Sequence, residues 1–308
     1  MGCLAFDTSN YTTSVAYFDG QRAHSCAKLL DVAPGQLGLR QSEALFAHVK
    51  RLPELVQTLM EQCAGAPVTA VAASTQPRAV PGSYMPCFLA GQSQGQALAA
   101  ALGVPFFAVS HQQGHLAAAL WSAGRMELME GRFLAWHLSG GTTELLLVQG
   151  DGKNLTARAI GGTKDLSAGQ VIDRTGRLLG LRFPAGKELD RLARQAPDET
   201  PFRVRPDGLF FSLSGLENQL TRLYEQGASA AQTAACALRS VCAAVRQATD
   251  AAWAQYPSLP VVFSGGVSSN TLLRRQFEAT QAVFAAPQYA TDNAMGVAVL
   301  GAGMEAQR

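Results

Sequence analysis

The chain has 308 residues, of which 47% are hydrophobic, 16% charged and 7% aromatic, and its formal net charge at pH 7 is +2. This length predicts two domains of ordinary size, and this composition excludes a largely disordered chain. No apolar run approaches the roughly 20 residues that cross a bilayer, and the near-neutral charge neither requires nor excludes a nucleic-acid partner.

Cysteine usage gives an expectation about the cellular compartment. The six cysteines contain no C-x-x-C pair, and most lie in apolar stretches where a thiol behaves as a small hydrophobic group. No charged leader precedes the first strand-like segment, so the sequence shows no secretory signal. We therefore expect a cytoplasmic protein with reduced cysteines and no membrane segment.

The first half of the chain alternates between strand-like and helix-like patterns. Ser42 can cap a helix that ends near Cys63, and Pro53 predicts a break or kink within it. A Pro- and Gly-rich loop separates the next strand from a helix of small residues. The expected elements are strands near 2–8, 12–18 and 22–30, a helix at 42–63, a strand at 68–73, a helix at 88–102, a strand at 105–109 and a helix from about Ser110.

The second half repeats this pattern after a boundary at 123–131. Its expected elements are a hairpin at 132–149, a strand near 155–160, several helices, a strand at 259–263, a helix at 269–280, a strand at 282–286 and a helix at 291–303. Three antiparallel strands followed by alternating helices and parallel strands, twice over, describe a duplicated ribonuclease-H-like α/β fold, as in actin, Hsp70 and sugar kinases. We expect lobes at 1–127 and 128–308 with a nucleotide cleft between them.

Three turns rich in Gly, Ser and Thr follow predicted strands and are candidates for binding a nucleotide. They are Asp7-Thr8-Ser9, Ser139-Gly140-Gly141-Thr142, and Ser264-Gly265-Gly266-Val267-Ser268-Ser269-Asn270, where Ser268 or Ser269 is expected to cap the helix that follows. Backbone N–H groups in such turns, and the positive end of a following helix, suit an anion. A single Gly-Gly turn is also what any sharp turn needs, but three at matching places favour nucleotide binding.

A pair of histidines is the candidate metal site. His111 and His115 are four residues apart, so they lie on one helix face and can ligate one ion. Asp292 is the best candidate for a third ligand, although it could instead cap the last helix. The H-E-x-x-H peptidase mechanism needs a Glu after the first His, and Gln112 cannot take a proton, which argues against peptidase activity.

Further carboxylates lie near predicted helix junctions between the two Gly-Gly turns. Asp165 and Asp173 belong to one such helix, while Gly186 and Asp190 belong to the next. Carboxylates there can hold ribose or substrate hydroxyls, although capping and surface solvation explain them equally well.

Taken together, these motifs resemble the TsaD/Gcp family, the tRNA adenosine threonylcarbamoyltransferases once named O-sialoglycoprotein endopeptidases. The resemblance spans nearly the whole chain, and the motifs occur in family order. The matching segments are His111–Leu116 (H-x-E-G-H-L in the family), Ser139–Thr143 (S-G-G-H-T), Asp165–Asp173 (D-x-x-A-G-E-x-x-D), Pro184–Gly186 (P-A-G), Phe211–Leu216 (F-S-x-S-G-L), Gly265–Asn270 (G-G-V-x-x-N) and Thr291–Asn293 (T-D-N).

The resemblance implies transfer of a threonylcarbamoyl group from threonylcarbamoyl-AMP to N6 of the adenosine beside the tRNA anticodon, with a shorter homologue of the same fold as partner subunit. It implies one iron or zinc ion at His111, His115 and Asp292, acting as a Lewis acid and template. The expected contacts of the adenylate-type substrate are Asp7, Leu138, Ser139, Gly140, Gly141, Thr142, Asp173, Gly186, Asp190, Gly265, Gly266 and Asn270.

The chain also departs from the family pattern. The departures are Asp7 for Glu, Gln113 for Glu, Thr142 for His, Gln170 for Glu, Glu217 for Lys, and a loop at 76–85 without Gly-Pro-Gly-Leu. They keep open a divergent nucleotide- and metal-binding paralogue that acts as a regulatory or assembly subunit. An ATP-dependent small-molecule kinase also fits the fold, but it gives the histidine pair no use. No residue is a convincing general base.

Overall fold

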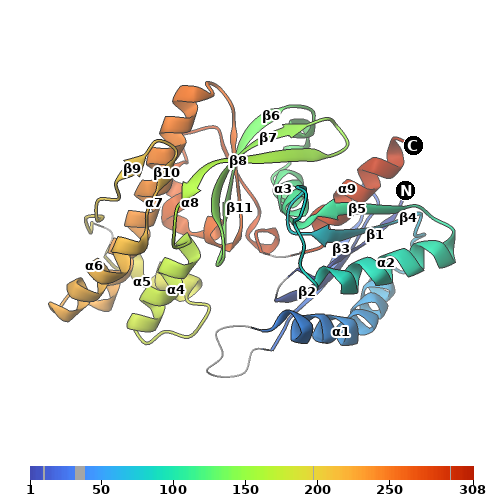
Figure 1. Ribbon diagram of the computed structural model, residues 1–308, viewed down its shortest axis with the longest axis horizontal. Helices are drawn as coiled ribbons and strands as arrows, with labels where there is room; N and C mark the ends of the chain where they lie inside the picture. The colour runs from blue at the N-terminus through green and yellow to red at the C-terminus, as the bar shows by residue number, and fades with distance from the viewer. Residues whose placement is uncertain (10, 32–38, 197, 292) are drawn as a thin grey trace. The chain divides into compact units, whose positions relative to one another are not determined.

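The computed structural model describes residues 1–9, 11–31, 39–196, 198–291 and 293–308 (Figure 1). Its contacts define two compact units. The first contains Met1–Gly131, Gln149–Ala157 and Thr291–Arg308, and the second contains Arg132–Val148 and Arg158–Ala290. The first unit is therefore assembled from three stretches of chain, whereas the sequence predicted one continuous lobe at 1–127. Among the described residues, no helix is both long enough and apolar enough to span a membrane.

The first unit is built on a five-stranded sheet in the order β3-β2-β1-β4-β5. Strands β1, β2 and β3 pair antiparallel, and β4 and β5 continue the sheet in parallel with β1, as the sequence predicts. The bounds are β1 (Cys3–Asp7), β2 (Thr12–Phe18), β3 (Ala23–Leu29), β4 (Ala70–Gln76), β5 (Phe106–Ser110), α1 (Gln41–Gln62), α2 (Phe88–Leu102), α3 (His111–Ser122) and α9 (Met295–Ala306).

Side chains alternate across β1 and bury both faces of this sheet. Leu4 and Phe6 join Leu52 in a cluster under α1 and α2. On the opposite face, α9 packs so closely that a Cβ added to Gly301 would lie 2.4 Å from Cys3 Sγ. In Figure 1, α1 and α2 lie on one side of this sheet, with α3 and α9 on the other. This packing fixes the strand ends from which the first part of the candidate site is built.

The start of α1 differs from the prediction. The helix begins at Gln41, and the Glu43 carboxylate accepts a hydrogen bond from the Arg40 N–H at 3.1 Å, so Ser42 is not its cap. The helix also continues through Pro53, so the predicted break there is wrong.

The second unit contains most of a seven-stranded sheet in the order β12-β11-β6-β7-β8-β10-β9. Trp136 on β6 is fully buried, and its indole N–H donates to Thr249 Oγ1 on α7 at 2.9 Å. The bounds are β6 (Arg132–Leu138), β7 (Thr143–Gly150), β8 (Leu155–Thr163), β9 (Pro206–Asp207), β10 (Phe210–Phe211), β11 (Val261–Ser264), β12 (Ala282–Phe284), α4 (Ala168–Leu178), α5 (Gly186–Ala193), α6 (Ser214–Glu225), α7 (Ala230–Gln255) and α8 (Thr271–Gln276).

Late helices differ from their predicted lengths. The predicted helix at 269–280 is only the six-residue α8, and a short 3-10 helix at Gly266–Ser269 precedes it. Asn270 caps α8, so the predicted cap by Ser268 or Ser269 is wrong. The last helix begins at Met295 rather than near 291. The 26-residue α7, which forms much of the core of this unit, was predicted only as one of several helices.

Candidate functional site

The histidine pair opens α3, immediately after β5. Ser110 ends the strand and caps the helix, because its hydroxyl accepts from the Gln113 N–H while the Gln113 side chain accepts from the Ser110 N–H. His111 and His115 follow on one face, with their Nε2 atoms 2.9 Å apart. The two side chains therefore lie side by side, as predicted, because they are four residues apart on one capped helix.

Asp7 lies against this pair. Its Oδ2 atom is 2.9 Å from His111 Nδ1, and its Oδ1 atom accepts from Ser9 N–H and Ser74 Oγ, both at 2.9 Å. The carboxyl ends of the parallel strands β1, β4 and β5 meet at one sheet edge, which brings these residues together. Sequence reasoning placed Asp7 in a nucleotide loop and missed its contact with His111.

The spacing of the two imidazoles fits a shared divalent ion. Zinc–nitrogen distances are about 2.0–2.1 Å, so an ion equidistant from two Nε2 atoms 2.9 Å apart would see them at an angle of about 90°. Asp292, the predicted third ligand, lies outside the described residues. Within the described part of the chain, no three His, Cys, Asp or Glu side chains group as a metal site.

Two of the predicted nucleotide loops lie next to each other in the second unit. Strands β6 and β11 are parallel neighbours with His137 opposite Ser264, so the turns that follow them start side by side. Gly265 has a φ of 86°, and a Cβ there would lie 2.2 Å from the Leu138 carbonyl oxygen. Glycine is required at this position both by the left-handed conformation and by the close approach of the two backbones.

The turn at 139–142 is an exposed, well-braced loop. Ser139 N–H donates to the Thr142 carbonyl at 2.8 Å, and Thr142 N–H donates to Ser139 Oγ at 3.1 Å. Gly140 and Gly141 are exposed, and a Cβ at either position would meet nothing within 4 Å. Ser167, the cap of α4, donates to the Gly140 carbonyl at 2.7 Å. The start of α4 thus braces the turn while the glycines stay accessible.

Asp190 and Asn270 are in direct contact. Asp190 Oδ1 accepts from Asn270 Nδ2 at 2.9 Å and from the Thr271 hydroxyl at 2.9 Å. Asn270 Oδ1 accepts the N–H groups of Leu272 and Leu273, both at 3.0 Å, as the cap of α8. These two predicted substrate residues therefore form one braced unit, in which much of the hydrogen-bonding capacity of Asn270 is used structurally.

Asp173 and Gly186 meet at the α4–α5 junction. Asp173 Oδ1 accepts from the Ala185 N–H at 2.9 Å, one residue before Gly186 opens α5. Burial raises the pKa of Asp173 above its ordinary value, and the Ala185 hydrogen bond opposes that shift. Asp173 thus ties the two helices together.

One polar side chain beside the candidate loops, His137 on β6, was missed by sequence reasoning, whereas Ser9 and Ser268 lie within turns that the sequence identified. His137 Nδ1 is 3.2 Å from Ser264 Oγ, and the Ser264 hydroxyl also lies 3.1 Å from the Trp136 carbonyl oxygen. Ser9 Oγ and Ser268 Oγ are buried and have no hydrogen-bond partner among the residues that the structure describes. The signal for His137 was its position, directly before the predicted turn at 139–142.

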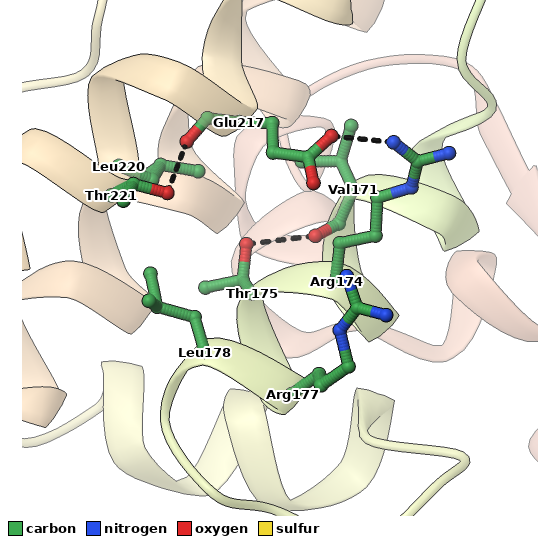
Figure 2. Close-up of a pocket in the computed structure, with 8 residues that line it drawn as sticks. All are labelled: Val171, Arg174, Thr175, Arg177, Leu178, Glu217, Leu220 and Thr221. Carbon is green, nitrogen blue, oxygen red and sulfur yellow. Dashed lines mark hydrogen bonds and ion pairs between the residues drawn. The ribbon is translucent and has the colours of Figure 1, made fainter. Parts of the chain in front are cut away.

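Gln113 and Glu217, two of the departures from the family pattern, have local explanations. Gln113 Nε2 donates to Asn154 Oδ1 at 2.9 Å and to the Leu155 carbonyl at 2.8 Å, which a glutamate could not do. Glu217 forms an ion pair with Arg174 across a groove between α4 and α6 (Figure 2). A lysine at 217 would instead place a second cation beside Arg174.

The groove in Figure 2 has a volume of about 160 Å³. Its lining contains none of the predicted substrate contacts, so it is separate from the candidate loops. The lining residues are Val171, Arg174, Thr175, Arg177, Leu178, Glu217, Leu220 and Thr221.

Comparison with known proteins adds independent information. The family model TsaD, tRNA N6-adenosine threonylcarbamoyltransferase, matches residues 32–299. The tRNA N6-adenosine threonylcarbamoyltransferase of Streptococcus pneumoniae is 32% identical over 292 residues, which cover 90% of this chain and 83% of that protein.

Solved structures support the fold. Component A of the (R)-2-hydroxyglutaryl-CoA dehydratase of Acidaminococcus fermentans has a TM-score of 0.57 at 14% identity, with 100% of both chains covered. Full-length HypF, in its phosphate- and nucleotide-bound form, has a TM-score of 0.60 at 13% identity. The alignment covers 99% of this chain and 46% of HypF, so the chain spans less than half of that protein. The predicted duplicated ribonuclease-H-like fold is confirmed.

Proposed function

The chain belongs to the TsaD family of tRNA N6-adenosine threonylcarbamoyltransferases, and from this premise we propose that it moves a threonylcarbamoyl group from threonylcarbamoyl-AMP to N6 of the adenosine next to the anticodon. Family membership makes it a tRNA-modifying transferase. The observation that carries the finer proposal is the 2.9 Å approach of the His111 and His115 Nε2 atoms, because two imidazoles so placed suit a metal ion and have no use in a small-molecule kinase.

The proposed adenylate site is made by the loops of the second unit. The exposed Gly140-Gly141 turn offers backbone to an anion without side-chain obstruction, and the buried Ser268 hydroxyl is a donor that has no partner among the described residues. Asp173 and Asp190 are proposed to lie near the sugar, and the Asp190–Asn270 pair braces the second loop. In this proposal the loops bind and orient the AMP half of the substrate.

The proposed metal site is held by the first unit. Nε2 of His111 and Nε2 of His115 are the donors, and Asp292 is the proposed third ligand. Imidazole and carboxylate form a donor set that suits divalent zinc or iron. When bound, such an ion supplies Lewis-acid polarisation and a template for the threonylcarbamoyl oxygens.

The reaction needs little activation of its nucleophile. The N6 amine forms a bond to the carbamoyl carbon, the bond from that carbon to the phosphate oxygen breaks, and AMP leaves with the electron pair. Because AMP is a good leaving group in a mixed anhydride, positioning of the two reactants is the main task of the protein. The surplus proton of the amine leaves N6, and no residue is assigned as its acceptor.

Two further proposals follow from the family. We propose that the chain works in the cytoplasm and that it acts on tRNA together with a shorter homologous subunit of the same fold. Co-purification of a tagged chain from its own cells tests the subunit. Recovery of the tagged chain without a smaller protein of this fold would contradict that proposal.

The test of activity is nucleoside analysis of tRNA. In a strain that relies on this chain for the modification, mass spectrometry is expected to detect threonylcarbamoyladenosine, and His111→Ala is expected to abolish it together with stoichiometric bound metal. Tight metal binding without the modified nucleoside would reject the transferase proposal and favour a regulatory or assembly subunit. Stoichiometric metal retained by folded His111→Ala would reject the metal site.

A further inference from the structure

We infer that Asp7 is a positioning residue for the metal-binding histidine, which fixes the tautomer and ring orientation of His111. The inference rests on the proposed metal site and adds a residue that acts through His111. It replaces the expectation that Asp7 contacts the nucleotide.

The Asp7 carboxylate is itself held in one orientation. It is 2% exposed, and its Oδ1 atom accepts hydrogen bonds from the Ser9 N–H and from Ser74 Oγ. Two donors on one oxygen stabilise the ionised carboxylate and stop it from rotating. The Oδ2 atom is thereby directed at His111 Nδ1, 2.9 Å away.

This contact determines which nitrogen of His111 carries its proton. An ionised carboxylate can only accept, so the His111 Nδ1 atom must donate, and the neutral ring then has its lone pair on Nε2. The Nε2 atom faces His115 Nε2, where the proposed ion would bind. A carboxylate behind a ligating histidine sets ring orientation and raises ligand basicity, and its loss typically lowers metal affinity about 10- to 100-fold.

Direct contact with the substrate phosphate is a poorer explanation of the same residue. The two Asp7 oxygens already make three hydrogen bonds to Ser9, Ser74 and His111. A phosphate close to this buried carboxylate would also meet a like charge, which is unfavourable in a low-dielectric site.

The experiment compares Asp7→Asn with the matched control Asp250→Asn in the full chain. Asp7→Asn keeps the shape of the side chain but lets the amide donate to His111 Nδ1, which favours the opposite tautomer. Asp250→Asn makes the same chemical change at an exposed carboxylate on α7, which pairs with Arg246 and not with His111. Zinc affinity is measured by competition with a chromophoric chelator, thermal unfolding reports folding, and 15N NMR reports the His111 tautomer in metal-free protein.

The expected result is a Nδ1–H tautomer for His111 in the unaltered protein, about 10- to 100-fold weaker zinc binding by Asp7→Asn, and a change of less than about threefold by Asp250→Asn. Wild-type zinc affinity of folded Asp7→Asn overturns this inference alone. A Nε2–H tautomer in the unaltered metal-free protein also overturns it, and needs no variant to fold. Metal retained by His111→Ala overturns both the metal site and the role of Asp7.

Discussion

Gln113 offers the sharpest test of the packing that supports the histidine helix. The substitution Gln113→Glu changes one nitrogen to an oxygen at a position that is 6% exposed. In the native protein, Gln113 Nε2 donates to Asn154 Oδ1 and to the Leu155 carbonyl, and Oε1 accepts from Ser110 N–H. The variant keeps the hydrogen bond from Ser110. Its second carboxylate oxygen, however, faces two other acceptors, Asn154 Oδ1 and the Leu155 carbonyl oxygen, with no donor between them.

The expected loss follows from those contacts. The two lost hydrogen bonds contribute about 1 kcal/mol each, and burying acceptors without donors costs about 1–3 kcal/mol more. We therefore expect the free energy of unfolding at pH 7 to fall by about 3–5 kcal/mol. Burial and the facing oxygens should raise the pKa of the introduced carboxyl above its value in the unfolded chain. Because the pKa is raised in the folded state, the introduced carboxyl destabilises the variant least below its unfolded pKa of about 4.3. The destabilisation grows as the pH rises from there through the pKa of the folded state.

The assay is thermal unfolding of Gln113→Glu between pH 4 and pH 8, with Gln96→Glu as a matched control because Gln96 is exposed on α2. We expect a midpoint about 10 °C lower for Gln113→Glu at pH 7, a smaller deficit at pH 4, and little change for the control. A Gln113→Glu midpoint within about 2 °C of the unaltered protein across this range would refute the reasoning.

Two further predictions concern a helix crossing and a carboxylate. A Cβ at Gly296 would lie 1.8 Å from the Gly114 carbonyl oxygen, so Gly296→Ala should destabilise the α3–α9 contact by at least about 1–3 kcal/mol and weaken zinc binding. Gly303→Ala is the control, because a Cβ there has no neighbouring atom within 4 Å. Equal denaturant midpoints for the two variants would contradict this prediction. Burial alone raises the pKa of Asp165, but hydrogen bonds from Ser212, the Leu213 N–H and Ser214 lower it to about 2. The stability that the Asp165 carboxylate contributes is therefore complete above its unfolded pKa near 3.9 and is lost as the pH falls through about 2. The loss of unfolding free energy in Asp165→Asn, measured by urea unfolding, should shrink between about pH 5 and pH 2. A loss that stays constant over this range would show that the carboxylate charge is not responsible.

Local features of the fold were predictable because short stretches of sequence determine them. Helix α2 has the predicted bounds, and β1, β2 and β3 lie where their apolar runs and turns place them. The start of α1 was misjudged because two candidate capping groups, Ser42 and Glu43, lie next to each other, and only the folded backbone decides which one is used.

The candidate site was predictable only in part, because some of its contacts are local in sequence and others are not. His111 and His115 adjoin through helical periodicity, which a sequence reveals. The contact from Asp7 to His111 joins residues 104 positions apart, and that from His137 to Ser264 joins residues 127 apart. Such contacts depend on strand order and register, which periodicity alone does not give.

The construction of the first unit from distant stretches of chain has a consequence for its biosynthesis. Helix α9 packs on β1 and against α3, yet the ribosome makes it only after the whole 158–290 stretch. At about 5–20 residues per second, roughly 10–30 s separate residue 131 from residue 295. The newly made α3 lacks its packing partner α9 for that interval, so the apolar surface that the two helices share stays exposed until the C-terminal segment is made.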